Sequence, residues 1–145
     1  MNISDNTRTL NKGRLKGGCL CGAVRYQVHN KFSHFFLCHC KQCQQFTGSA
    51  FAANIFTSPD NIEWLTGNEK ISCYEHPNRE FSKAFCSACG CALPFINQSG
   101  KSLIIPASSL FDKVENMPEA NMFVNEQAHW LNDGLAEKKF SHFPN

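Results

Sequence analysis

Cysteine is the residue type whose number and spacing first suggest chemistry in this chain. Nine of the 145 residues are cysteines, which is well above ordinary usage. Eight of them stand in tight CxC and CxxC groups, where a disulfide within one group would be strained. The odd count and this spacing favour metal binding over a disulfide scaffold. The chemistry to expect is therefore that of metal thiolates.

Two groups offer two thiols each, from segments far apart in the sequence. GGCLCG contains Cys19 and Cys21, which an extended backbone would point to the same side. FCSACGCAL contains Cys86 and Cys89 in a CxxC turn followed by Gly90, an arrangement typical of zinc sites. We predict that these four cysteines bind a structural zinc ion in a closed tetrahedral site. The alternative, four buried reduced cysteines, is less favoured because buried cysteines seldom fall at ligand spacing.

The middle group, LCHCKQC, supplies three thiols from one short segment: Cys38, Cys40 and Cys43. Catalytic zinc typically has three protein ligands and one open position, so the group is compatible with a second, open zinc site. It is also compatible with a closed site in which Cys91, Cys73 or a histidine is the fourth ligand. The spacing alone does not decide between them.

Two residues near these groups are given other roles. His39 lies between two of the cysteines, and alternation along an extended chain should point it the other way, toward a packing or surface role. Cys73 stands alone in a strand-like stretch and is predicted to be an ordinary core residue.

Short strands and turns must position these groups. Alternating and continuous apolar runs predict strands from Ala23 onward and over residues 32–38, 50–56, 80–86, 92–97, 103–108 and 121–130. Residues 62–68 and 69–76 are expected to form a hairpin that turns at Gly67 and Asn68. Only residues 40–46 and 134–139 suit short helices. The pattern predicts an all-β (mainly β) protein.

Composition narrows the class of protein further. Residues 1–16 are polar and aperiodic, so they are interpreted as a lead-in to a single domain at residues 17–145. The N-terminus has no apolar run of signal-peptide type, and no stretch is long enough to span a membrane, so a cytoplasmic location is expected. The formal net charge of +2 would fall as cysteines become thiolates, which argues against a nucleic-acid surface.

Three motifs together resemble one known family. GGCLCGAVRY, CHCKQCQQFTGSAF and FCSACGCALPF, in this order, are similar to motifs of the glutathione-dependent formaldehyde-activating enzyme family, which also includes centromere protein V. The segment EANMFVNEQAHWLNDGL resembles the closing segment of that family, with Trp130 and Asp133 in the expected places. The match runs from about Gly17 to Asp133. Cys91 is a departure, because the family usually has a small hydroxyl residue there, and an extra thiol could compete for a metal or cap the open site.

The resemblance implies a fold, a cofactor and an activity. The fold would be a small one of twisted antiparallel sheets, stapled by a zinc on Cys19, Cys21, Cys86 and Cys89. A second zinc on Cys38, Cys40 and Cys43 would leave one position for the thiol of glutathione. The implied function is a carbon–sulfur lyase or synthase acting on thiol–aldehyde adducts, with glutathione and formaldehyde as partners. The alternative is a zinc-stabilised, non-catalytic binding module for a small thiol or a protein.

Overall fold

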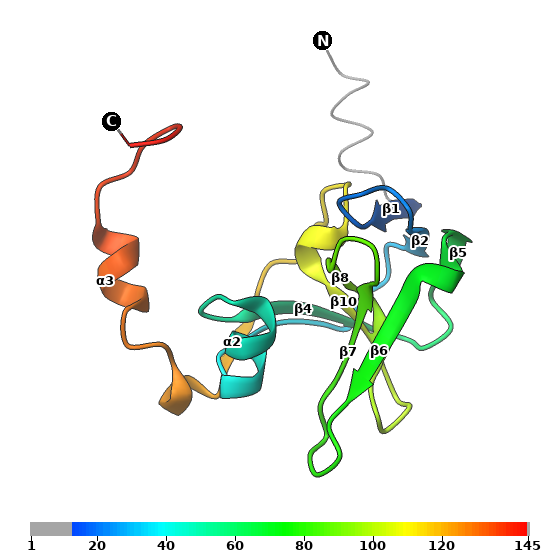
Figure 1. Cartoon of the computed structure of the whole chain (residues 1–145), viewed down its shortest axis with the longest axis horizontal. Helices are drawn as coiled ribbons and strands as arrows, with labels where there is room; N and C mark the ends of the chain where they lie inside the picture. Colours follow the sequence, from blue (N-terminus) through cyan, green and yellow to red (C-terminus); the bar gives the residue numbers. More distant parts are fainter. Residues whose placement is uncertain (1–12, 145) are drawn as a thin grey trace.

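The computed structural model describes residues 13–144 and contains three small β-sheets (Figure 1). The two α-helices in this part are short, α2 (Lys41–Thr47) and α3 (Leu131–Ala136). Three short 3-10 turns, η1 (Asn68–Lys70), η2 (Ala107–Ser109) and η3 (Val124–Glu126), join strands or end them. The mainly β fold expected from the sequence is confirmed.

The first sheet has the order β1-β2-β5 and is antiparallel. It contains β1 (Arg14–Gly18), β2 (Arg25–His29) and β5 (Glu63–Thr66). The alternation seen in the sequence holds, because Tyr26 and Val28 are buried and their neighbours in β2 are less so. Leu15 of β1 is also fully buried. The folded part therefore begins before Gly17, inside the segment interpreted as a lead-in, of which residues 1–12 lie outside the described chain.

The second sheet is the largest and has the order β11-β3-β4-β10-β9. Its strands are β3 (His34–Cys38), β4 (Ala52–Thr57), β9 (Phe95–Ile96), β10 (Leu103–Pro106) and β11 (Ala120–Met122). All neighbours pair antiparallel except β11, which runs parallel to β3. The strand expected at 121–130 ends at Met122, because Phe123 takes a left-handed conformation with φ of 58° and the chain turns into η3.

The third sheet has the order β6-β7-β8 and corrects one expectation. It contains β6 (Ile71–Glu75), β7 (Ser82–Cys86) and β8 (Ala92–Leu93). The hairpin expected over residues 62–76 is wrong, since β5 pairs with β2 and β6 pairs with β7. Gly67 does turn the chain, with φ of 81°, but it leads into η1 and out of the first sheet. The segment thus joins two sheets instead of closing one hairpin.

The buried side chains form three clusters that follow this arrangement. The main core lies between the first two sheets and includes Leu15, Tyr26, Val28, Phe35, Ile55, Leu103, Ile105 and Leu110. A second cluster joins the first and third sheets around Cys19, Val24, Ala84, Cys86 and Leu93. The third surrounds Cys38, Cys40, Cys43 and Ala52. Two of the three clusters are therefore built around cysteines.

Helix α2 and the C-terminal segment differ in how they are held. Gly48 ends α2 in a left-handed conformation, and its N–H donates to Gln44 O at 2.8 Å. Helix α3 has no buried residue and lies away from the sheets (Figure 1).

In the part of the chain described, neither helix has the length or the hydropathy needed to cross a membrane.

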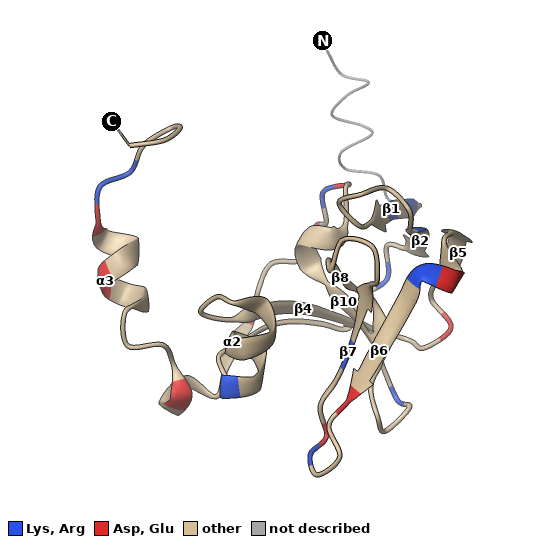
Figure 2. Ribbon diagram, viewed as in Figure 1, with Lys and Arg blue, Asp and Glu red and all other residues tan. Residues whose placement is uncertain are grey.

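Charged residues of both signs are interspersed along the described chain (Figure 2). Opposite charges are sequence neighbours at Glu69 and Lys70 and again at Arg79 and Glu80. This mixing accompanies the small net charge of +2 for the full sequence.

Candidate metal centres and the cavity between them

Four cysteine sulfurs from the end of β7 and the turns that follow β1 and β7 converge at the first candidate metal centre. The Sγ atoms of Cys19, Cys21, Cys86 and Cys89, here called the four-cysteine cluster, all lie within 4.8 Å of one another. Cys19 directly follows β1, and Cys86 is the last residue of β7. The structure therefore brings together the four residues whose spacing predicted a zinc site; that they bind zinc stays a prediction.

Tight turns shape both halves of the four-cysteine cluster. Gly22 and Gly90 have φ values of 88° and 79°, which residues with a Cβ rarely adopt. The N–H of Gly90 donates to Cys86 O at 2.7 Å and closes the CxxC turn. The N–H of Val24 donates to Cys19 Sγ at 3.3 Å. Amide donors of this kind favour the thiolate over the thiol, as metal binding requires.

The sulfur distances fit a tetrahedral metal ion. Cys19 Sγ and Cys21 Sγ lie 3.6 Å apart, and Cys21 Sγ and Cys86 Sγ lie 3.9 Å apart. Four thiolates placed about 2.3 Å from a zinc ion would be separated by about 3.8 Å. Backbone amide donors also hold the pKa of the Cys89 thiol at about 6, with Cys91 N–H the largest contributor. The donor set and its spacing therefore suit zinc.

Three more sulfurs converge at the second candidate centre. Cys38, Cys40 and Cys43, here called the three-cysteine cluster, are all buried, and their Sγ atoms lie within 4.8 Å of one another. Cys38 ends β3, Cys40 is the N-cap of α2, and Cys43 lies inside that helix. The Cys40 sulfur accepts the N–H of Cys43 at 3.4 Å, so the ligand spacing and the helix start depend on the same residue.

The electrostatics of the three-cysteine cluster also suit a cation. Interaction with the Cys43 thiol lowers the pKa of Cys38 to about 6, although burial opposes this. The Cys38 sulfur in turn raises the pKa of Cys43, and burial raises that of Cys40. Protein groups alone therefore favour one thiolate among three sulfurs. A bound cation would compensate the charge of all three.

The residues considered as a fourth ligand of the three-cysteine cluster do not join that cluster in the structure. Among the described residues, no other cysteine, histidine or carboxylate joins the three-cysteine cluster. Cys91 lies beside the four-cysteine cluster, where its sulfur accepts the Leu20 N–H at 3.4 Å. His39 is buried, and its Nε2 donates to Asn121 Oδ1 at 2.9 Å, so of the packing and surface roles predicted for it the structure shows packing. Cys73 is exposed, so the prediction that it belongs to the core is wrong.

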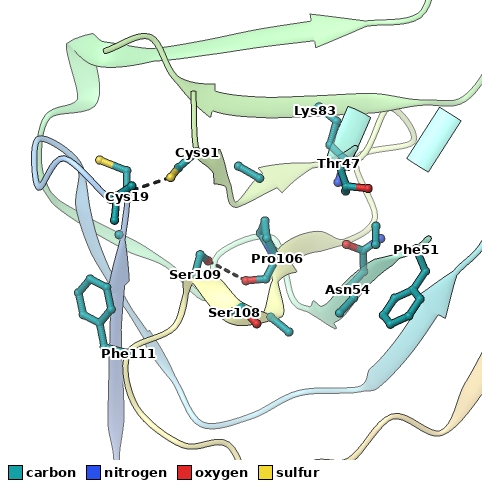
Figure 3. Close-up of a pocket in the computed structure, with 16 residues that line it drawn as sticks. Cys19, Thr47, Phe51, Asn54, Lys83, Cys91, Pro106, Ser108, Ser109 and Phe111 are labelled. Atoms are coloured by element: carbon teal, nitrogen blue, oxygen red, sulfur yellow. Dashed lines mark hydrogen bonds between the residues drawn. The ribbon is translucent and has the colours of Figure 1, made fainter. Parts of the chain in front are cut away.

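A cavity of about 540 Å³ is lined in part by Cys19 of the four-cysteine cluster (Figure 3). Cys19 and Cys91 lie at one end of this larger cavity, and Thr47, Asn54 and Lys83 lie at the other. A smaller cavity of about 180 Å³ is lined by Cys43 of the three-cysteine cluster. Asn54 and Lys83 line both cavities. The larger volume lies within the range of about 300–1,000 Å³ that is typical of small-molecule sites, and the smaller one lies below it.

Lys83 is the feature that the sequence interpretation missed. Its side chain is buried, with 3% of the residue exposed. Its Nζ lies 5.8 Å from the centre of the Phe46 ring and 5.1 Å from that of Phe95. Burial lowers its pKa, and the three nearby cysteines act in the opposite direction. The available signal was a lysine in the apolar run FSKAFC, directly before a CxxC turn.

Comparison with known proteins gives the class of the chain. Residues 14–126 match the family of glutathione-dependent formaldehyde-activating enzymes. The match covers most of the chain, so the protein belongs to this family, as the resemblance predicted.

Two particular proteins show how far the likeness extends. The chain is 27% identical over 125 residues to a protein of Halomonas elongata, with 81% of this chain and 79% of the relative covered. The name of that relative assigns it provisionally to the same glutathione-dependent activity. A crystal structure of a Rhodobacter sphaeroides protein superposes with a TM-score of 0.54 at 24% identity, over 74% of this chain and 98% of the other. This second likeness concerns the fold alone.

Proposed function

We propose that the protein is a zinc-dependent carbon–sulfur lyase or synthase that acts on the adduct of glutathione and formaldehyde. Membership of the family supports glutathione and formaldehyde as the partners. The observation that carries the proposal is the three-cysteine cluster, three buried sulfurs beside a cavity that Cys43 lines. Three protein ligands with an adjoining cavity are typical of zinc sites that bind a substrate.

The two clusters would have different roles. Cys19, Cys21, Cys86 and Cys89 would hold a structural zinc, because four thiolates complete a tetrahedral site. Cys38, Cys40 and Cys43 would hold a second zinc with one remaining position. When bound there, zinc would supply the Lewis acidity that removes the proton of a thiol ligand. The buried setting of the three cysteines would keep bulk water from competing for the site.

The reaction makes few demands on the protein. The thiolate sulfur of the substrate adds to the carbonyl carbon of the aldehyde, and a C–S bond forms. The π electron pair of the carbonyl moves to oxygen, which takes up the proton that the thiol released. The product is a hydroxymethyl thioether, and no electrons are gained or lost overall. In the lyase direction the same bond breaks and the thiol is recovered. The protein must therefore orient the thiol and aldehyde and guide one proton.

The test compares Cys40→Ala with Cys73→Ala. Both remove one thiol, but Cys73 is exposed and outside both clusters. Zinc content, melting temperature and the rate of S-(hydroxymethyl)glutathione formation and breakdown, followed by exchange NMR, are measured together. We expect Cys40→Ala to lose one zinc and the rate enhancement while the protein stays folded, with a melting temperature lower by only a few degrees because the N-cap of α2 is lost. Cys73→Ala should match the wild type.

Two results would count against the proposal. If Cys40→Ala loses all zinc and unfolds, the three-cysteine cluster is structural. If wild-type protein binds glutathione but leaves the exchange rate at its uncatalysed value, the chain is a non-catalytic binding module.

A further inference from the structure

Lys83 and Asn54 are buried near the three-cysteine cluster and lack an ion pair or a hydrogen-bond donor among the described residues, as His39 Nδ1 and Ser82 Oγ lack hydrogen bonds. Lys83 is 3% exposed, and no carboxylate of the described chain lies within ion-pair distance of its Nζ. Asn54 is 8% exposed, and its Oδ1 accepts no hydrogen bond from the described residues. A buried cation without an ion pair and a buried carbonyl oxygen without a donor are both costly, although the two aromatic rings near Lys83 offset part of the cost of the cation. Such groups call for a ligand that supplies the missing partners.

The positions of Lys83 and Asn54 indicate which kind of ligand could supply the missing partners. Lys83 and Asn54 both line the smaller cavity, which Cys43 also lines, and both line the larger cavity. Asn54 lies on β4 and Lys83 on β7, so rigid strands hold both groups. Figure 3 shows the two side chains at the same end of the larger cavity, together with Thr47. A molecule whose sulfur reaches the three-cysteine cluster would place the rest of its structure against these groups.

We infer that Lys83 and Asn54 select the thiol substrate, Lys83 by binding a carboxylate and Asn54 by accepting an N–H through Oδ1. The ligand class is a small thiol that carries a carboxylate and an amide N–H near its sulfur, as a cysteinyl compound does. The inference rests on the proposed function, because it needs the thiol to bind at the three-cysteine cluster. The aldehyde cannot fill this role, since it has neither a charge nor an N–H.

The chemistry of the two groups supports this division of roles. Lys83 Nζ lies close to two aromatic rings, which stabilise a cation without satisfying its hydrogen bonds. An ammonium so placed keeps its donors for an anionic ligand. The Asn54 oxygen can only accept, so the ligand must donate. A carboxylate and an N–H on one molecule match both groups at once.

The first test uses the wild-type zinc protein and three thiols as probes. N-acetylcysteine carries a carboxylate and an N–H, N-acetylcysteinamide replaces the carboxylate with a neutral amide, and 3-mercaptopropionate keeps the carboxylate but lacks the N–H. Dissociation constants are measured by isothermal titration calorimetry. Because hydrogen bonds to charged groups are among the stronger ones, N-acetylcysteine should bind roughly tenfold to a hundredfold more tightly than its amide. It should also bind several-fold more tightly than 3-mercaptopropionate.

The second test assigns each preference to its residue. Lys83→Met should abolish the preference for the carboxylate, and Lys83→Arg should retain part of it. Asn54→Ala should leave the carboxylate preference but abolish the advantage of N-acetylcysteine over 3-mercaptopropionate. Lys70→Met removes an exposed lysine and should change neither. Zinc content is measured for each variant.

The outcomes separate the inference from the function on which it rests. If the wild type binds N-acetylcysteine and its amide equally, the role of Lys83 is overturned while thiol binding stands. If Lys83→Met keeps its zinc and the full carboxylate preference, the role is overturned as well. If no thiol binds the zinc-loaded wild type, both the inference and the proposed function fail. The comparison of thiols on the wild type decides the matter even if a variant does not fold.

Discussion

Cys86 and Cys73 show how differently two cysteines of one small protein can be placed. Cys86 is 0% exposed, ends β7 and belongs to the four-cysteine cluster. Cys73 lies on the adjacent strand β6 and is exposed. The same thiol-to-hydroxyl change should therefore have very different effects at the two positions.

We expect Cys86→Ser to leave the protein insoluble or unfolded, because structural zinc sites contribute folding free energy directly. Cys73→Ser should melt within about 2 °C of the wild type, since surface substitutions usually change stability by less than about 0.5 kcal/mol. Circular dichroism melts with zinc analysis check both. A soluble, zinc-free and cooperatively melting Cys86→Ser protein would refute the structural role.

The residues of the candidate site were only partly predictable from the sequence. Ligand spacing in CxC and CxxC groups is a local property, so it identified which cysteines would converge. Lys83 has no such signature. Its burial results from the packing of β7 beside Phe46 of α2 and Phe95 of β9, segments distant in sequence. Cys73 was misplaced for a related reason, since a strand pattern does not show which of its faces is covered.

At the scale of elements, the chain around Gly67 shows why the hairpin prediction failed. A Gly-Asn pair between two strand-like runs is a common hairpin signal. Here the glycine lies against the backbone of another segment, since a Cβ at this position would stand 2.1 Å from Ala23 O. The residue type is thus required by close approach as well as by its φ of 81°. Sequence alone cannot distinguish these two reasons for a glycine.

Gly67→Ala should destabilise the protein far more than Gly48→Ala. Both glycines have positive φ values, which cost an alanine about 1–2 kcal/mol. At Gly48 nothing lies within 4 Å of the added Cβ, whereas at Gly67 the backbone of Ala23 and Val24 would have to move. We expect a loss of about 3 kcal/mol or more at Gly67. Urea denaturation of both variants measures the difference, and equal losses would contradict the close-approach explanation.

At the scale of the whole molecule, the two cysteine clusters differ in which parts of the fold they connect. The four-cysteine cluster links the segment after β1 to the end of β7 and so connects the first and third sheets. The three-cysteine cluster draws all its ligands from residues 38–43, at the end of one strand and the start of one helix. Loss of metal from the first would release two sheets from each other, and loss from the second would free one short segment.

Purified protein should therefore contain between one and two zinc ions per chain. Mild chelation should remove the ion of the three-cysteine cluster first, because three thiolates with an exchangeable fourth position hold zinc less tightly than four thiolates. Far-ultraviolet circular dichroism should stay unchanged until the ion of the four-cysteine cluster is lost. Loss of both ions in a single step, together with unfolding, would show that the two clusters are not independent.

The separation of the cysteines in sequence has a consequence for the order of events during synthesis. Residues 38–43 can leave the ribosome and capture zinc at once, because their loop is very short. Cys21 must wait for Cys86, which lies 65 positions later, and closing so long a loop is slower and entropically costlier. The ion that we propose to be functional would thus be captured first, and the ion that completes the fold last. A nascent chain halted before Cys86 would already hold zinc without being folded, and the rate of final folding would depend on the zinc still free at that moment.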